Sequence, residues 1–477
     1  MLTLVNTNRM VPPIAPVGLD YVAATVRDAG FDVELIDLCL ADDPKTYLAD
    51  YFRRRRPSLV GLSFRNVDDC FWPSGQSFVE TLIDDVRTIR GLTDAPIVLG
   101  GVGFSLFPRR LLELTGAEFG VHGDGELAVV ELLRQIHGRR RWERVPGLLY
   151  RAGGTIHANP PAWPKTVSVP GHRELVDNEL YFRRGGQIGV ETKRGCARGC
   201  IYCADPLTKG RAFRLRPPSD VVEEVQRLVE RGIDVLHLCD PEFNLPLAHA
   251  KAICDELIRR GIGRRVRWYA YLAVVPFSVE LARQMRRAGC VGIDFTADSA
   301  HPALLAAYGH AHTAEDIDKA VRACRENQIA VMLDMLLGGP GESPKTVEHT
   351  IRAFQRIGPD CAGAALGVRL YPGTAVAETA RREGRCSANI RRLYHGPTDL
   401  LRPTFYLSAA LGDRPAALVR ELIGTDERFF PPEDPQIGPA EAGGASHNYN
   451  QNKRLLDAIE VGARGAYWDI LRRLPRT

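Results

Sequence analysis

Short apolar runs alternate with amphipathic stretches along the first 150 residues of the chain. Between the runs lie stretches of helical periodicity, such as Gly18–Ala29, in which apolar residues recur at the spacing of one helix face. Five strand–helix units in succession predict a doubly wound parallel sheet, and ligands of such sheets bind at the carboxyl ends of the strands. The expected strands are Leu2–Asn6, Val33–Leu38, Leu59–Phe64, Ile97–Gly101 and Glu118–His122.

A second alternating series begins near Gln187. Thr313 and Asp316 have the spacing of a capping box, and Pro344 suits a first helical position. Six units are too few for a closed eight-stranded barrel, so we expect an open, partial (β/α)6 barrel. Its expected strands are Ile188–Thr192, Val235–Cys239, Arg267–Leu272, Val291–Thr296, Ala330–Leu337 and Gly363–Leu370, and its expected helices are Ser219–Glu230, Leu247–Arg260, Val279–Ala288, Thr313–Asn327 and Pro344–Ile357.

The same patterning divides this α/β chain into four segments. Residues 1–145 form the first sheet, and residues 146–187, which hold five prolines and little periodicity, are expected to be a linker. Residues 188–385 form the partial barrel. The alternation stops near residue 386, and residues 386–477 are expected to form a small, mostly helical domain that covers the opening of an active site.

Composition narrows the class of protein. With 45% hydrophobic and 25% charged residues, the chain has an ordinary globular composition. No apolar run reaches the roughly 18 residues of a membrane span, and the start, MLTLVNTNR, does not resemble a signal peptide. We therefore expect a cytoplasmic protein without a membrane partner. The basic run Arg53–Arg56 ends an expected helix, where cations complement the helix dipole, so nucleic acid is not an expected partner.

Three of the eleven cysteines are crowded into eight positions: Cys196, Cys200 and Cys203. The other eight are scattered singly, as small buried hydrophobic residues often are. Three thiolates on one short loop can bind three irons of a [4Fe-4S] cluster and leave the fourth iron open. The alternatives are a zinc site, which would need a fourth ligand that the spacing does not supply, and a chance cluster.

The sequence CxxxCxxC, with Tyr202 before the last cysteine and a strand before the loop, resembles the radical SAM superfamily. The stretches Asp294–Ser299, Leu336–Ser343 and Arg369–Thr374 resemble further elements of that superfamily. The resemblance implies a [4Fe-4S] cluster whose open iron is chelated by S-adenosylmethionine. It also implies that S-adenosylmethionine is bound by Tyr202, Glu242, Asp298, Ser299, Gly338, Gly339, Pro340 and Arg369.

Several of these residues also have an ordinary structural interpretation. The Gly338–Pro340 stretch is typical of a strand-to-helix turn. Asp298 and Ser299 are residue types that cap turns. Glu242 is either a contact of the cofactor or of the open iron, or a carboxylate on a surface turn.

The first segment resembles the cobalamin-binding domains of class B radical SAM enzymes. The similar stretches are the opening NTNRMVPPIAPVGLDYVAATVRDAGFDVELIDL and GLSFRN, VLGGVGFS and FGVHGDGE. The motif DxHxxG is absent, so no histidine is assigned as the lower ligand of cobalt, and no GxGxxG follows the first strand, which disfavours a dinucleotide site. The resemblance implies cobalamin contacts from Asn8, Pro13, Ser63, Arg65, Asn66, Gly100, Gly101, Gly103, Gly123 and Glu126.

Arg65 follows the third expected strand, where some members that methylate aromatic carbons place an arginine beneath the corrin ring. A guanidinium cannot ligate cobalt, because it has no free lone pair at neutral pH. It would leave the cobalt five-coordinate or lower and favour transfer of a methyl cation equivalent. The alternative is that Arg65 pairs with Asp68 or Asp69 in a turn.

The final segment carries aromatic and amide side chains that suit an aromatic substrate. His447 and Tyr449, in HNYNQN, are candidates for a base or for substrate orientation. The alternative is a packed helical cap with Tyr467 and Trp468 in its core.

Together the resemblances imply a cobalamin-dependent radical SAM C-methyltransferase. Its methyl group would pass from S-adenosylmethionine through cobalamin to a carbon of a small molecule, by a radical route on an sp3 carbon or a polar route on an electron-rich ring. Arg65 favours the polar route, on a heteroaromatic ring such as pyrrole or indole in antibiotic-type metabolism. A flavodoxin-like or ferredoxin-like protein is the expected electron donor.

Two other functions remain open on the sequence alone. One is cyclisation or rearrangement with the same cofactors and no methyl transfer. The other is a cobalamin sensor or methyl carrier whose cluster is structural. A methylthiotransferase is disfavoured, because its first domain would carry three cluster cysteines and only Cys39 and Cys70 lie there.

Overall fold

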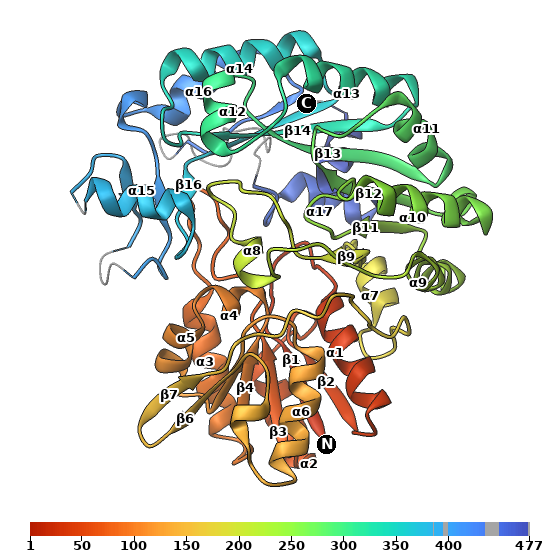
Figure 1. Ribbon diagram of the computed structural model, residues 1–477, viewed down its shortest axis with the longest axis vertical. Coiled ribbons are helices and arrows are strands. Elements are labelled where there is room, and N and C mark those ends of the chain that lie inside the picture. Colours follow the sequence, from red (N-terminus) through yellow and green to blue (C-terminus); the bar gives the residue numbers. More distant parts are fainter. Residues whose placement is uncertain (385, 395–398, 435–447, 476–477) are drawn as a thin grey trace.

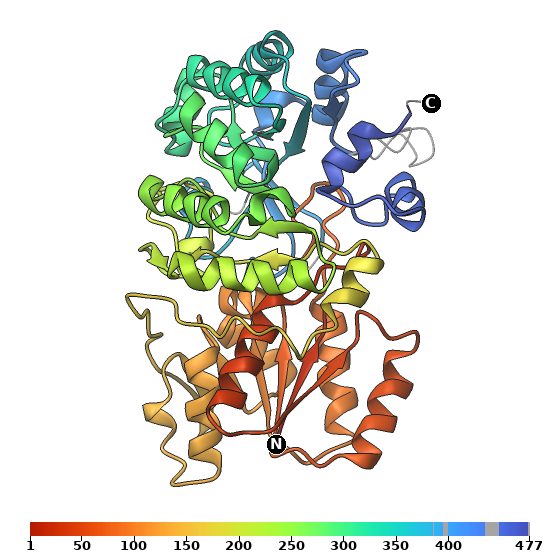
Figure 2. The same cartoon turned by 90° about the vertical axis from the view of Figure 1, so that its right-hand side faces the viewer.

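The computed structural model describes residues 1–384, 386–394, 399–434 and 448–475. Two α/β units are stacked on one another, with the N-terminal unit (red to orange) below the second unit (yellow-green to cyan) in Figure 1. The carboxyl ends of the N-terminal strands point toward the second unit (Figure 2). The division into a doubly wound domain followed by a partial barrel is therefore confirmed.

The N-terminal sheet has the strand order β2-β1-β3-β4-β5, all parallel, which is a doubly wound arrangement. Each expected strand is present within two residues of its expected ends. The strands are β1 (Leu2–Asn6), β2 (Val33–Asp37), β3 (Leu59–Ser63), β4 (Ile97–Gly100) and β5 (Phe119–Val121), and the helices are α1 (Val17–Asp28), α2 (Pro44–Arg54), α3 (Val79–Arg90), α4 (Val102–Leu106), α5 (Pro108–Thr115) and α6 (Glu126–Ile136), followed by the 3-10 turn η1 (Trp142–Arg144).

The expected linker begins with regular structure, so its first part is corrected. Strands β6 (Leu148–Ala152) and β7 (Thr155–Ala158) form a hairpin that adds antiparallel to β5. Gly153 and Gly154 both have positive φ, which permits the tight turn between them. Leu148, Leu149 and Ile156 bury their side chains against the sheet, which holds the hairpin in place. The remainder carries α7 (Asn178–Arg183).

The second sheet is an open barrel wall with the order β8-β11-β12-β13-β14-β15-β19, all parallel. The capping box at Thr313 and the N-terminal position of Pro344 are both as expected. The strands are β8 (Gly189–Val190), β11 (Val235–Leu238), β12 (Arg267–Leu272), β13 (Cys290–Asp298), β14 (Ala330–Leu337), β15 (Cys361–Leu366) and β19 (Phe429–Phe430), and the helices are α9 (Pro218–Glu230), α10 (Leu247–Arg259), η2 (Ile262–Arg264), α11 (Val279–Arg287), α12 (Pro302–Tyr308), α13 (Ala314–Glu326) and α14 (Pro344–Ile357).

The last expected barrel strand is divided in two. Gly367 adopts positive φ after β15, and the chain then pairs away from the barrel in a small antiparallel sheet of order β16-β18-β17. This sheet comprises β16 (Val368–Arg369), β17 (Ile390–Arg392) and β18 (Thr404–Tyr406), and α15 (Ala375–Glu383) follows β16. A shorter pair, β9 (Lys193–Arg194) and β10 (Arg214–Leu215), flanks α8 (Asp205–Thr208).

Helices α17 (Lys453–Glu460) and α18 (Tyr467–Arg473) pack on the face of the barrel sheet away from the outer helices, whereas α16 (Pro415–Ile423) packs against the outer helix α14. In Figure 2 the green barrel helices lie on one side of the sheet and the violet C-terminal helices on the other. Tyr467 and Trp468 are buried with Tyr269 and Met332 of the strands, as expected for a packed cap. The 3-10 turn η3 (Ala409–Leu411) precedes α16. Among the described residues, no helix is both long and apolar enough to cross a bilayer.

The two units are joined by a network of fully buried charges. Arg173, in the linker, bonds Asp20 of α1 at 2.9 Å and Glu224 of α9 at 3.3 Å. Arg216 bonds the other oxygen of Glu224 at 2.7 Å, and the Tyr21 hydroxyl donates to Glu224 at 2.9 Å. The linker residue Arg173 thus ties α1 to α9, and Tyr21 reaches Glu224 directly; because these groups are excluded from water, each charge depends on its partners.

We expect Glu224→Gln to destabilise the whole chain. The change leaves two buried guanidinium groups with one carboxylate fewer, which costs about 3–5 kcal/mol. Urea unfolding of the full-length protein measures this loss. The matched control is Glu223→Gln on the same helix, whose exposed pair with Arg227 contributes less than about 1 kcal/mol. Equal, small losses in both variants would contradict the role assigned to the network.

Candidate active site

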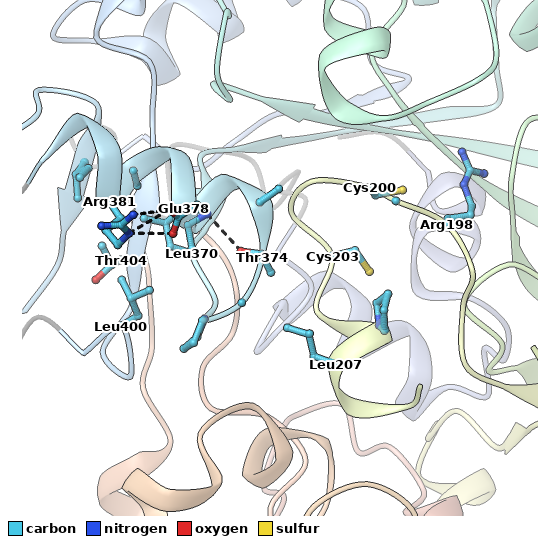
Figure 3. Close-up of a pocket in the computed structure, with 18 of the residues that line it drawn as sticks. Arg198, Cys200, Cys203, Leu207, Leu370, Thr374, Glu378, Arg381, Leu400 and Thr404 are labelled. Atoms are coloured by element: carbon cyan, nitrogen blue, oxygen red, sulfur yellow. Dashed lines mark hydrogen bonds and ion pairs between the residues drawn. The ribbon is translucent and has the colours of Figure 1, made fainter. Parts of the chain in front are cut away.

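The three clustered cysteines lie on one loop between β9 and α8, on which Figure 3 labels Cys200 and Cys203. Gly195 begins the loop at positive φ, and a Cβ there would lie 2.1 Å from the carbonyl oxygen of Ala212, so this position requires glycine. The strand before it is anchored by a fully buried ion pair of 2.8 Å between Lys193 and Asp240. The loop is therefore held at both its turn and its base.

The thiols on this loop suit a cluster better than a single ion. Cys196, Cys200 and Cys203 are free, and burial raises the pKa of Cys200 to about 11 and that of Cys203 to about 12. In the described ranges no three His, Cys, Asp or Glu side chains are arranged to hold one metal ion. A zinc site needs its ligands on one ion, whereas the cysteines of a [4Fe-4S] cluster each bind a different iron. The geometry therefore favours the cluster over zinc.

Two of the expected cofactor residues form a hydrogen-bonded group next to the loop. The Tyr202 hydroxyl donates to Oδ2 of Asp298, and the same oxygen lies 2.5 Å from Nε2 of His310. Asp298 adopts φ of +58°, a conformation that few non-glycine residues take, so its placement is enforced by these bonds. His310 was not singled out from the sequence.

Glu242 is not a surface turn carboxylate. It is 6% exposed, accepts a hydrogen bond of 2.8 Å from Thr296, and leaves Oε2 without a hydrogen-bond partner among the described residues. Burial raises its pKa to about 7, and its charge in turn raises the pKa of Cys196 and Cys200. An orphaned buried oxygen next to the cysteine loop fits a ligand at the open iron.

The glycine-rich stretch forms the strand-to-helix turn between β14 and α14. The Gly338 amide donates to Oε2 of Glu342 at 3.3 Å, and the Gly339 amide donates to the Tyr308 hydroxyl at 3.1 Å. A Cβ on Gly339 would lie 2.3 Å from that hydroxyl, so the glycine allows the turn to approach Tyr308 closely. Pro340 is half-buried in the same turn. The turn interpretation is confirmed, and a cofactor role for these residues stays a prediction.

Ser299 and Arg369 both have partners within the protein, and a cofactor role for either stays a prediction. Ser299 is wholly buried, and its hydroxyl contacts Thr350 at 2.9 Å and accepts the His301 amide at 3.1 Å. Arg369 pairs with Asp68 of the N-terminal domain at 2.8 Å and lies over the ring of Tyr371. Ser299 thus caps a turn, and Arg369 joins the two domains.

The carboxyl edge of the N-terminal sheet borders an apolar slot of about 170 Å3. Ser63, Gly100, Gly101, Gly123 and Glu126 line it, together with Leu19, Val22, Val98 and Val129. A Cβ on Gly100 would meet nothing, so this glycine is open to a ligand. Because glycine has no side chain, a ligand can approach the backbone of the slot closely at Gly100. The nucleotide tail of cobalamin is a group that would bind in this way.

The other glycines and Glu126 have structural roles that the sequence did not indicate. A Cβ on Gly101 or Gly103 would lie 2.6 or 2.9 Å from the carbonyl oxygen of Phe64, so these glycines let two turns pack together. A Cβ on Gly123 would lie 2.8 Å from the ring of Trp163. Glu126 accepts two hydrogen bonds from Arg194, at 3.0 and 2.7 Å, which makes it another joint between the domains.

A second cavity, of about 320 Å3, lies between the N-terminal edge and the barrel interior. Arg65 lines it and makes no ion pair with any residue that the structure describes. Asp68 is held by Arg369, and Asp69 accepts from Ser74, so the alternative in which Arg65 pairs with either aspartate is wrong. An unpaired guanidinium is thus left facing a cavity.

The remaining N-terminal candidates lie around Arg65. Asn66 and Arg65 both contact the sulfur of Met10, at 3.6 and 3.8 Å. Asn8 keeps Nδ2 buried without a hydrogen-bond partner among the described residues, and the carbonyl of Pro13 accepts from Tyr467 at 3.2 Å. Asn8 and Arg65 therefore have polar groups available to a ligand.

The barrel contributes the opposite wall of this cavity. Tyr449 lines it, as a substrate role would require, whereas His447 lies outside the described residues. The sequence interpretation missed four wall residues: His237, Tyr271, Asp294 and Asp334. Each is a polar residue inside an apolar strand, and that interruption is the signal by which they are recognisable.

Comparison with known proteins agrees with both halves of the chain. Residues 190–354 match the Radical SAM superfamily, and residues 4–133 match the B12 binding domain. The tryptophan 2-C-methyltransferase of Streptomyces laurentii is 32% identical over 444 residues, covering 79% of this chain and 74% of that protein.

Solved structures of TsrM from Kitasatospora setae, a radical S-adenosylmethionine methyltransferase, share the whole fold. One, with tryptophan and the analogue aza-SAM bound, is 33% identical with a TM-score of 0.90, covering 99% of this chain and 97% of that one. Another, with cobalamin and a [4Fe-4S] cluster bound, is 31% identical with the same TM-score and coverage.

We expect Cys200→Ser to abolish iron binding at the loop. After anaerobic reconstitution, the iron content should fall from about four per chain to near background, because a hydroxyl does not replace the thiolate of a [4Fe-4S] cluster. Cobalamin retention should be unchanged, since Cys200 lines neither the slot at Gly100 nor the cavity at Arg65. The matched control is Cys386→Ser, at an exposed single cysteine, which should keep its iron. Full iron retention in Cys200→Ser would rule the loop out as the cluster site.

Proposed function

This chain belongs to the cobalamin-dependent radical SAM methyltransferases, and we propose that it methylates a ring carbon of tryptophan or a close indole derivative. The protein is an enzyme that moves a methyl group from S-adenosylmethionine to carbon, with a [4Fe-4S] cluster and cobalamin as further cofactors. The methyltransferases among its relatives favour methyl transfer over the cyclisation that the sequence left open.

The residues in place fit these cofactors. Cys196, Cys200 and Cys203 would hold the cluster, with Glu242 and the Tyr202–Asp298 pair near its open iron. The slot at Gly100 and the face beside Arg65 would hold cobalamin. Once bound, the cobalamin supplies a cobalt atom that accepts a methyl group and releases it to carbon.

The cavity of about 320 Å3 that Arg65 lines, here called the central cavity, has an aromatic lining. This lining is the observation on which the substrate proposal rests. Phe71 and Met10 approach from the N-terminal domain, and Tyr449, Tyr467 and Trp468 from the C-terminal segment. Flat rings and a thioether provide the surfaces on which an indole packs. The tryptophan seen bound to the related TsrM supports the same substrate class for this chain.

Arg65 supports a polar route of transfer. Its guanidinium has no lone pair with which to ligate cobalt, and the described residues leave it unpaired at the cavity. An electron-rich indole carbon would then gain the methyl group and lose a proton, without removal of a hydrogen atom. Tyr449 lies in the same cavity and would orient the ring.

We further propose that the protein works in the cytoplasm and that a small flavodoxin-like or ferredoxin-like protein donates electrons to its cluster. A cavity of about 770 Å3 reaches Cys200 and Cys203 and carries Arg198 and Arg211 on its lining. Figure 3 shows this cavity between the cysteine loop and α15. A basic approach to the cluster suits an acidic donor.

Tryptophan incubated anaerobically with the reconstituted enzyme and S-adenosylmethionine bearing a deuterated methyl should become labelled on a ring carbon. Mass spectrometry and NMR locate the label. An unlabelled, rearranged product would support the cyclisation alternative, and absence of turnover for every indole tested would overturn the substrate proposal. Deoxyadenosine formed in step with product would count against the polar route.

Arg65→His should change the environment of cobalt, because imidazole can ligate a metal and guanidinium cannot. The paramagnetic resonance spectrum of the reduced, cobalamin-loaded wild type should show no nitrogen coupling, whereas the variant should gain it and lose methyl transfer at least tenfold. Arg87→His, on an exposed helix turn, is the control and should match the wild type. Nitrogen coupling in the wild type would contradict the position proposed for Arg65.

A further inference from the structure

Two acidic side chains face one another on the barrel wall of the central cavity. Asp294 lies on β13 and Asp334 on the adjacent strand β14, and their carboxyl groups are close enough to share a hydrogen bond. Both line the cavity that Arg65 borders from the other side. Neither is used by the cysteine loop or by the apolar slot.

Polar atoms of this wall are left without partners. Asp294 is 7% exposed, yet its Oδ1 has no hydrogen-bond partner among the described residues. His237 is 9% exposed, and its Nδ1 is likewise without a partner in that part of the chain. A buried polar atom without a hydrogen-bond partner lowers the stability of the folded protein. We therefore expect these atoms to accept hydrogen bonds from a bound ligand.

The wall consists of neutral or proton-sharing acceptors, with no cation next to Asp294 among the described residues. Burial and the neighbouring Asp334 raise the pKa of Asp294, and burial lowers the pKa of His237 to about 4, which keeps its ring neutral. No Lys or Arg of the described chain forms an ion pair with Asp294. The wall therefore presents hydrogen-bond acceptors, and Asp294 and Asp334 hold a proton between them.

We propose that Asp294 and Asp334, with Tyr271 and His237, form a subsite for the ammonium group of an amino-acid substrate. This inference rests on the proposed function and specifies how its substrate is held. An ammonium carries three N–H donors, and the wall offers two carboxyl groups, a hydroxyl oxygen and an imidazole nitrogen as acceptors. The aromatic side chains across the cavity would then receive the ring of the same molecule.

Two other occupants fit the wall less well. A divalent metal is disfavoured, because the described residues contain no group of three ligands that could hold one. A purely structural role is also disfavoured, since an apolar pair would fill the wall without the desolvation cost of two facing carboxyls. A ligand with several N–H donors, such as an ammonium group, satisfies the unpartnered oxygen of Asp294 and the unpartnered ring nitrogen of His237.

The test compares ligands that differ only in the ammonium group. Binding of tryptophan and of indole-3-propionate to the cofactor-loaded enzyme is measured by calorimetry for the wild type, Asp294→Asn and Asp334→Asn. We expect the wild type to prefer tryptophan by about tenfold or more, since charge-assisted hydrogen bonds are involved. Each variant should lose that preference through weaker tryptophan binding, while indole-3-propionate binds as well as before or better.

Controls separate local effects from misfolding. Asparagine has the shape of a protonated aspartic acid and removes the repulsion between the carboxyls, so both variants should keep their iron, their cobalamin and their thermal stability. Asp318→Asn, at an exposed pair on α13, is the matched control and should retain the wild-type preference. Equal weakening of both ligands, or unchanged tryptophan binding, would overturn the subsite.

A further pair of ligands keeps this inference distinct from the indole assignment. Phenylalanine and 3-phenylpropionate are compared in the same way. One outcome is that the wild type binds neither tryptophan nor indole-3-propionate, yet binds phenylalanine more tightly than 3-phenylpropionate. If Asp294→Asn abolishes that difference, the indole proposal fails and the ammonium subsite holds. If the wild type binds tryptophan no more tightly than indole-3-propionate, and phenylalanine no more tightly than 3-phenylpropionate, the subsite proposal is overturned.

Discussion

The buried ion pairs between the two domains are the interaction on which the site depends. Glu224 binds Arg173 and Arg216, and Arg369 reaches across to Asp68. Arg369–Asp68 joins the domains directly, and Arg173 joins them by pairing with both Glu224 and Asp20 of α1. These charges are taken out of water, so the network is stable only when both domains supply their part of it. This requirement fixes the carboxyl edge of the N-terminal sheet against the barrel, and the cavities between them follow from that orientation.

Within this set of satisfied charges, the groups left unsatisfied stand out. Arg65 on one wall makes no ion pair within the described chain, and Asp294 on the other keeps an oxygen without a partner. Glu242 near the cysteine loop keeps another. Arg65 and Asp294 line the same cavity and Glu242 lies near the cysteine loop, so we assign these three groups to the corrin face, the substrate and the cluster.

The two cofactor regions are built by different physical means. The cysteine loop relies on local geometry, with Gly195 at its turn and the Lys193–Asp240 pair at its base. The central cavity is assembled from three distant segments, of which the C-terminal one contributes Tyr449 and Trp468. Local rigidity suits a cluster bound by one short stretch, whereas a substrate cavity between domains takes its shape from their packing.

The sequence by itself determined the strands of the two parallel sheets, the capping box at Thr313 and the cysteine loop, because each arises from residues near one another in the chain. It did not show the β6–β7 hairpin, or that β16 leaves the barrel sheet. Only the tertiary structure decided the fate of side chains whose partners are distant. Arg369 and Glu126 bind across the domain joint, Ser299 turns into the packing of α14, and Asp294 meets Asp334 only when two strands align. Residue type shows that a polar group needs a partner, but only the fold brings that partner or leaves the place for a ligand.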